Sequence, residues 1–100
     1  MEKRNYRHGD VILVPANVPD KAEEKKGLTL AEGEVTGHSH RISDGVAKMF
    51  KFDKKVYLRV TSERAALVHE EHKRIDLPAG DYEVIIQQDY EPEGWKKVRD

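Results

Sequence analysis

Short apolar or alternating segments, separated at close intervals by turn residues, constrain this chain more than any other feature. The first, Val11–Val14, lies between Gly9-Asp10 and Pro15 and is apolar throughout, which predicts a strand buried on both faces. Further strand candidates are Leu28–Ala31, Glu34–Thr36, His38–Ser43, Lys48–Phe52, Lys55–Val60 and Tyr82–Gln88, of which the last three alternate or are β-branched and aromatic. Segments of this kind and spacing predict an all-β fold with about eight short strands.

The residues between these segments predict where the chain turns. Asp44-Gly45 is typical of a hairpin turn, and Asp53–Lys55 and Pro78–Asp81 predict two further turns. Gly33 indicates a bulge or a tight turn between its flanking strands. The segment Asp20–Lys26 holds one apolar residue among acids and bases, so we interpret it as a solvated loop.

A single domain, residues 1–100, accommodates all of these elements. Apolar residues make up 37% of the chain and charged residues another 37%, which predicts a thin core. We expect a small β-barrel, closed or partly open. Pro92 suits the first position of a helix, and Trp95 and Val98 lie three residues apart, so a short C-terminal helix is expected to follow the strands.

Charge and residue usage exclude several classes of protein. The formal net charge is −1 with the two signs interspersed, which argues against general nucleic-acid binding. The chain has no cysteine, so a disulfide framework and a thiolate zinc site are excluded, and any metal must be held by His, Asp or Glu. No apolar run has the length of a signal or membrane-spanning segment, and we expect a cytoplasmic protein.

Four of the five histidines fall into two closely spaced pairs. In a strand His38 and His40 point to the same side as Ile42, which predicts that this side faces inward. His69 and His72 flank Glu70-Glu71. If these glutamates form a two-residue turn, the histidines oppose each other across a hairpin, and a single helical turn would also bring them together.

These spacings predict that His38, His40, His69 and His72 share one transition-metal ion. Zinc is the first candidate, and nickel, copper or iron also suit imidazole ligands. Four imidazoles would close a tetrahedral site, whereas three would leave an open position. Glu34, Glu70 and Glu71 could supply a ligand, an acceptor for an imidazole N–H or a general base. His8 stands apart from both pairs and receives no role.

The motifs resemble those of a family of small uncharacterised bacterial and phage proteins. The resemblance spans nearly the whole chain and rests on Arg7–Pro15, Gly33–His40, His69–His72, Ile75–Tyr82 and Gln87–Tyr90. Its most specific parts are the sequence Gly-Glu-Val-Thr-Gly-His-Ser-His and the sequence His-Glu-Glu-His. A looser similarity to cupins rests on Gly33, His38 and His40, and it implies a cupin-like barrel as an alternative fold.

Three functions remain open at this point. The first is a zinc-binding barrel whose four-histidine site has a structural role or binds a ligand or partner. The second is a hydrolase-like or cupin-like metalloenzyme with three histidine ligands, in which Glu70 or Glu71 is the catalytic base. The third is a metal-free protein-interaction module. A thin core and open strand edges would also favour a homo-oligomer.

Overall fold

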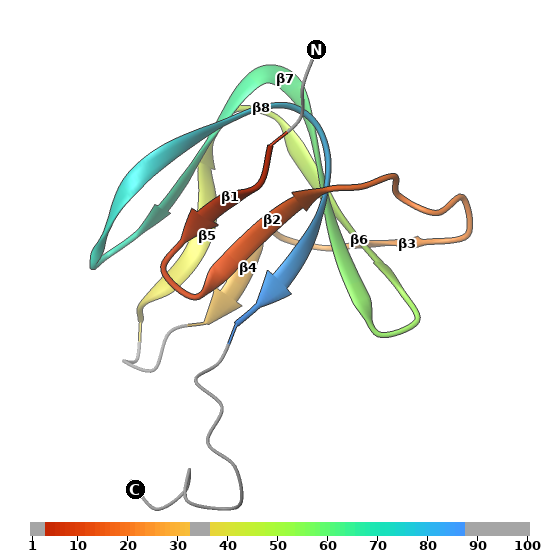
Figure 1. Cartoon of the computed structure of the whole chain (residues 1–100), viewed down its shortest axis with the longest axis horizontal. Helices are drawn as coiled ribbons and strands as arrows, with labels where there is room; N and C mark the ends of the chain where they lie inside the picture. The colour runs from red at the N-terminus through yellow and green to blue at the C-terminus, as the bar shows by residue number, and fades with distance from the viewer. Residues whose placement is uncertain (1–3, 33–36, 88–100) are drawn as a thin grey trace, which may run out of the picture.

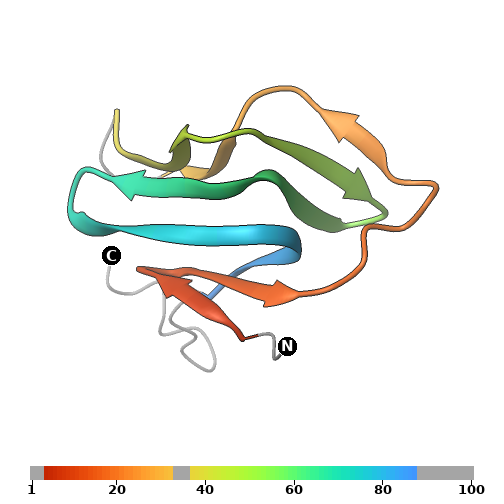
Figure 2. The same ribbon diagram turned by 90° about the horizontal axis from the view of Figure 1, so that it is seen from above.

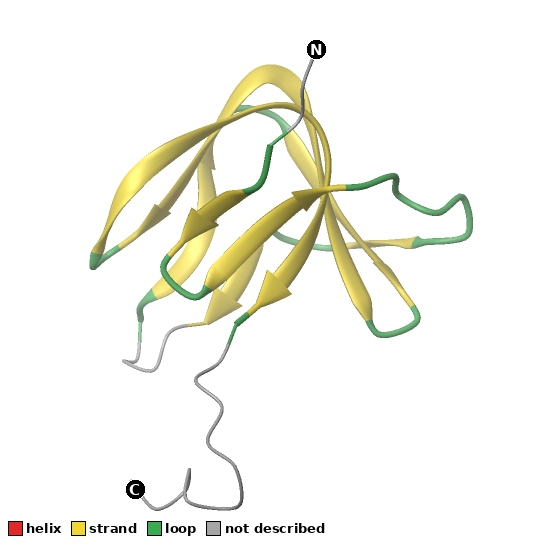
Figure 3. Cartoon of the chain, in the orientation of Figure 1, coloured by secondary structure: helices red, strands yellow, loops and turns green. Residues whose placement is uncertain are grey.

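The computed structural model describes residues 4–32 and 37–87, and these residues form strands and loops (Figure 1 and Figure 3). The strands are β1 Tyr6–His8, β2 Val11–Pro15, β3 Glu23–Lys25, β4 Thr29–Glu32, β5 Ser39–Asp44, β6 Ala47–Phe52, β7 Lys55–His69 and β8 His72–Ile86. Among the described residues no helix has the length and apolarity needed to cross a membrane. The helix predicted around Pro92, Trp95 and Val98 and the strand segment Glu34–Thr36 lie outside them.

All strands join one antiparallel sheet that curls into a half-barrel, which confirms the predicted all-β, partly open barrel. The order is β1-β2-β8-β7-β5-β4, and β6 pairs with β7 on the same side as β5 and carries β3 at its outer edge. β7 and β8 form the centre of the sheet and lie side by side along most of their length (Figure 2). At 15 residues each, these two strands are longer than predicted.

The long β7–β8 pair bends in the middle. Val60 pairs with Gly80 and Arg64 pairs with Pro78, so three residues of β7 oppose a single residue of β8, as in a large bulge. The turn predicted at Pro78–Asp81 is therefore wrong. The chain bends there without reversing, because β7 continues to pair with β8 on both sides, and the hydroxyl of Tyr82 donates a hydrogen bond of 2.7 Å to the Pro78 carbonyl.

The hairpin turn predicted at Asp44-Gly45 is also wrong. β5 and β6 do not pair with each other, because both run antiparallel to β7 on either side of its bend. Gly45 has φ +95, and a Cβ at this position would overlap the Arg64 carbonyl. The glycine thus lets two neighbouring strands bend together at a barrel corner. The turn predicted at Asp53–Lys55 is confirmed, with Asp53 at φ 59 between β6 and β7.

Part of the segment Asp20–Lys26 forms a strand, so the prediction of a loop over the whole segment is wrong. Residues Glu23–Lys25 form β3, and Glu24 pairs with Phe50 of β6. The backbone of β3 supplies the pairing while the side chains of Glu23 and Glu24 stay exposed. A short, charged edge strand of this kind needs no apolar side chain, which is why its composition gave no indication of a strand.

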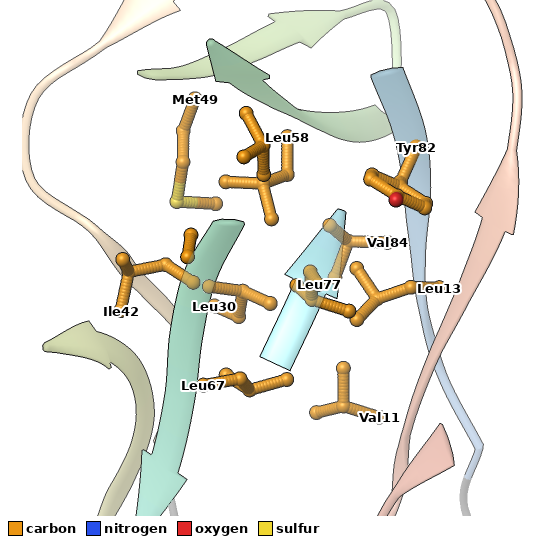
Figure 4. Close-up of a cluster of buried hydrophobic side chains, with 12 residues drawn as sticks. Val11, Leu13, Leu30, Ile42, Met49, Leu58, Leu67, Leu77, Tyr82 and Val84 are labelled. Carbon is orange, nitrogen blue, oxygen red and sulfur yellow. The ribbon is translucent and has the colours of Figure 1, made fainter. Parts of the chain in front are cut away.

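The core lies inside the curl and draws side chains from both sides of the bend (Figure 4). Leu13, Leu58, Leu67 and Leu77 are fully buried, at 0% exposed. The remaining buried members are Val11, Leu30, Ile42, Met49, Val60, Ala65, Tyr82 and Val84. Among the described residues, the buried polar or charged side chains are those of His8 and His40.

Candidate metal centre

The His69–His72 segment forms the two-residue turn that its spacing allowed. β7 ends at His69, β8 begins at His72, and the two residues are directly paired. Their ring centroids are 4.8 Å apart. The prediction that these histidines oppose each other across a hairpin is confirmed, and the alternative of a helical turn is wrong.

The first histidine pair lies at the start of β5. His40 is 5% exposed and Ile42 is 7% exposed, so the prediction that this face points inward is confirmed for both residues. His38 precedes β5 and is half-buried.

Three of the predicted ligands come together at one place. The ring nitrogens of His40, His69 and His72 that could bind a metal all lie within 4.8 Å of one another. The centroid of the His40 ring is 4.3 Å from that of His69 and 5.5 Å from that of His72. His40 is buried, His69 half-buried and His72 exposed, so the group extends from the core to the surface.

His38 belongs to a neighbouring group rather than to this one. It forms a second cluster with His69 and Glu70, and its ring centroid is 5.8 Å from that of His69. Its Nδ1 atom is 3.3 Å from Oε2 of Glu71 but is buried without a hydrogen bond. His69 is therefore the residue that the two clusters share.

Glu70 connects the β7–β8 turn to the start of β5. One carboxylate oxygen accepts a hydrogen bond of 3.0 Å from the backbone N–H of Ser39, and the other lies 3.0 Å from the Arg41 guanidinium. Hydrogen bonds from backbone amides, its own first and then that of Ser39, hold the pKa of Glu70 below its usual value, and Arg41 adds to this effect. Glu34 lies outside the described residues.

His8, to which the sequence analysis gave no role, belongs to the histidine cluster. It is 3% exposed, and its Nδ1 lies 2.9 Å from Nδ1 of His40. Its other ring nitrogen, Nε2, lies 2.8 Å from the backbone carbonyl of Lys73. The alternation of Tyr6 and His8 along β1 could have indicated an inward face, but the contact itself depends on how the sheet curls.

The turn between β1 and β2 lies against the histidine cluster, and its backbone lies near the β7–β8 turn in both views (Figure 1 and Figure 2). Gly9 in this turn has φ +60, and a Cβ there would lie 2.6 Å from Nε2 of His72 and 2.9 Å from Cε1 of His40. Glycine is therefore needed both for the backbone conformation and for the close approach to the imidazoles.

Burial keeps the innermost imidazoles neutral. It lowers the pKa of His40 to about 4, and the neighbouring His69, His8 and His72 add to the effect. Burial also lowers the pKa of His8, although the hydrogen bond with the Lys73 carbonyl opposes it. Neutral imidazole is the form that binds metals.

The β7–β8 turn sets the proton position on His69. The backbone N–H of Glu71 donates a hydrogen bond of 2.9 Å to Nδ1 of His69. A neutral His69 ring with this acceptor carries its own proton on Nε2.

The fold and the cluster define a class of protein. It is an antiparallel half-barrel in which imidazoles gather between the β1–β2 turn and the β7–β8 turn. Residues 7–87 match the model of a family described as a domain of unknown function (DUF8820), and the chain belongs to this family. No curated protein and no solved structure matches it. The family description carries no activity, so a function must be argued from the site.

Proposed function

We propose that this domain binds a divalent transition metal through His40, His69 and His72, with zinc as the first candidate. The observation that carries the proposal is the approach of three imidazole ring nitrogens to within 4.8 Å of one another. The local β7–β8 turn brings His69 and His72 together, and the pairing of β5 with β7 in the tertiary fold adds His40.

The side-chain movement that a metal would require is small. Zn–N bonds of about 2.0 to 2.1 Å in a tetrahedral site place ligand nitrogens roughly 3.3 Å apart. Nitrogens within 4.8 Å therefore need to approach by about 1.5 Å at most. The exposed His72 and the half-buried His69 can supply this movement by side-chain rotation, while the buried His40 stays in place.

Three imidazoles leave one coordination position, and the exposure of His72 puts that position within reach of solvent. His38 would complete the predicted four-histidine site by rotating toward His69. Water, a small ligand or a partner residue would otherwise occupy the position. This arrangement supports a binding role for the metal more than a purely structural one, because structural sites are closed by protein ligands.

The contacts of the two glutamates favour binding over hydrolysis. Ser39 and Arg41 engage both carboxylate oxygens of Glu70, and one carboxylate oxygen of Glu71 faces His38. A general base needs an oxygen directed at metal-bound water. In the present arrangement these two side chains hold the first histidine motif, and we therefore rank the metalloenzyme second.

Metal binding should change the β7–β8 turn. A metal on Nε2 of a neutral His69 would require that its proton move to Nδ1, which could then no longer accept the hydrogen bond from the Glu71 amide; a metal on Nδ1 would displace the same hydrogen bond. The backbone amide resonance of Glu71 is therefore expected to shift strongly when zinc is added to isotope-labelled protein.

The test is the metal content and zinc affinity of protein purified without a histidine tag. We expect about one metal ion per chain, and an affinity loss on the order of 100-fold or more in His72→Ala, since even outer-sphere substitutions cost about 10- to 100-fold. Lys73→Ala is the matched control, because Lys73 is the exposed neighbour on β8 and offers the cluster only its backbone carbonyl. His38→Ala distinguishes three ligands from four.

A parent protein that stays metal-free after incubation with zinc, cobalt, nickel, copper and ferrous iron would contradict the proposal. Equal losses of affinity in His72→Ala and Lys73→Ala would contradict the assignment of the ligands.

A further inference from the structure

The contacts of His8 form a chain of two hydrogen bonds that ends at a candidate metal ligand. The Lys73 carbonyl lies 2.8 Å from Nε2 of His8, and Nδ1 of His8 lies 2.9 Å from Nδ1 of His40. Both rings are buried, at 3% and 5% exposed. Neither imidazole can therefore exchange these partners for water without moving out of the core.

The Lys73 carbonyl fixes which atom donates and which accepts in both hydrogen bonds. A carbonyl oxygen only accepts, so Nε2 of His8 must carry a proton and donate it to Lys73. A neutral His8 then has no proton on Nδ1, which becomes an acceptor. His40 must donate from its own Nδ1, and a neutral His40 therefore has its lone pair on Nε2.

We infer that His8 is a positioning residue that fixes the proton of His40 on Nδ1 and so leaves Nε2 free to bind a metal. The metal-binding part of this inference rests on the proposed function. The position of the His40 proton follows from the hydrogen bonds alone. Metal-binding histidines commonly donate their second N–H to a carboxylate, a carbonyl or water. Here the acceptor is another imidazole, which a backbone carbonyl orients.

The hydrogen-bond pattern predicts which substitutions preserve the effect. A glutamine at position 8 has a carbonyl oxygen that can accept from Nδ1–H of His40 and an amide that can donate to Lys73. A methionine fills a similar volume but offers no comparable acceptor or donor. His8→Gln and His8→Met are therefore a matched pair that separates hydrogen bonding from packing.

The experiment combines two measurements on the full chain. Nitrogen-15 NMR of the imidazole rings in metal-free protein near neutral pH reports which ring nitrogen of His40 carries the proton. Competition titration with zinc then reports the affinity. We expect Nδ1–H on His40 in the parent and in His8→Gln, with similar zinc affinities. In His8→Met we expect a mixture of the two proton positions and zinc binding weakened about 10- to 100-fold.

Each outcome decides one question. If His40 of the parent carries its proton on Nε2, the inference is overturned, even if zinc binds. This measurement uses the parent protein alone, so it does not depend on whether a variant folds. Equal proton positions and zinc affinities in His8→Gln and His8→Met would also overturn it. A parent with Nδ1–H on His40 that binds no metal would support the proton assignment and contradict the proposed function instead.

Discussion

The two ends of the bent β7–β8 pair bury side chains equally well but by different means. Toward the β6–β7 turn, Leu58 and Met49 are 0% and 1% exposed and pack among other apolar groups. Toward the β7–β8 turn, His8 and His40 are 3% and 5% exposed and meet through ring nitrogens. The apolar end depends on filled volume, whereas the histidine end also depends on the position of individual protons.

The largest expected effect tests whether the two ends are independent. Leu58→Ala removes a side chain that is 0% exposed and should lower the free energy of unfolding by about 2–5 kcal/mol. Its zinc affinity in the folded state should equal that of the parent. Chemical denaturation and zinc competition measure the two quantities, and a large loss of affinity would show that the ends are coupled.

The pH dependence of stability should distinguish the histidine end. Unfolded His40 takes up a proton near pH 6.5, but folded His40 stays neutral until about pH 4 because burial lowers its pKa. The stability of metal-free protein is therefore full above pH 6.5 and is lost as the pH falls toward 4, by about 2–3 kcal/mol from this group. His8, whose pKa is also lowered, contributes in the same direction.

Denaturation curves at several pH values, with a chelator present, measure this loss. His40→Asn should show a flatter dependence than the parent, while Leu58→Ala should keep the parent's slope. Parallel curves for His40→Asn and the parent would mean that His40 is not buried in neutral form.

A smaller difference is expected between two glycine variants, one in the β1–β2 turn that covers the imidazoles and one at a position with nothing within 4 Å of an added Cβ. Gly9→Ala and Gly27→Ala both place a Cβ at positive φ, +60 and +87, at a cost of about 1–2 kcal/mol each. Only the alanine at position 9 would also crowd His72 and His40, adding about 1–3 kcal/mol and weakening zinc binding. Thermal denaturation and zinc titration compare the pair, and equal behaviour would place the turn away from the cluster.

The smallest effect should come from the link between the two histidine motifs. Glu70→Gln keeps an acceptor for the Ser39 amide but loses the charge that faces Arg41. Because Glu70 is exposed and screened by solvent, zinc affinity should fall by less than about tenfold. Arg41→Gln is the matched change on the other side. A much larger loss in Glu70→Gln alone would favour a direct role for this carboxylate at the metal.

The local part of this structure could be predicted from the sequence. The apolar run Val11–Val14 lies in β2, because a short apolar run between turn residues is typical of a buried strand. The His69–His72 spacing matches the two-residue turn between β7 and β8. The bend was missed because Asp44-Gly45 and Pro78–Asp81 carry turn residues that also suit barrel corners. Such residues can reverse the chain or only bend a strand. Which of the two occurs depends on whether the strand continues to pair with the same neighbouring strand beyond them.

The role of His8 could not be predicted for a related reason. Its partners, His40 and Lys73, are 32 and 65 residues away along the chain. Local periodicity carries no information about such distances, and only the curl of the sheet sets them. The two histidine motifs were recognised because each is compact in sequence, whereas a lone histidine has no such pattern.

The contact between β1 and β8 has a consequence for the time at which the cluster can form. During synthesis on the ribosome, His8 emerges 65 residues before Lys73, whose carbonyl orients it. Until β8 follows, the growing chain displays His8, His38 and His40 without the hairpin that completes the group. The cluster therefore assembles only after β8 has been synthesised, and a metal that requires His40, His69 and His72 together could bind only from that point on.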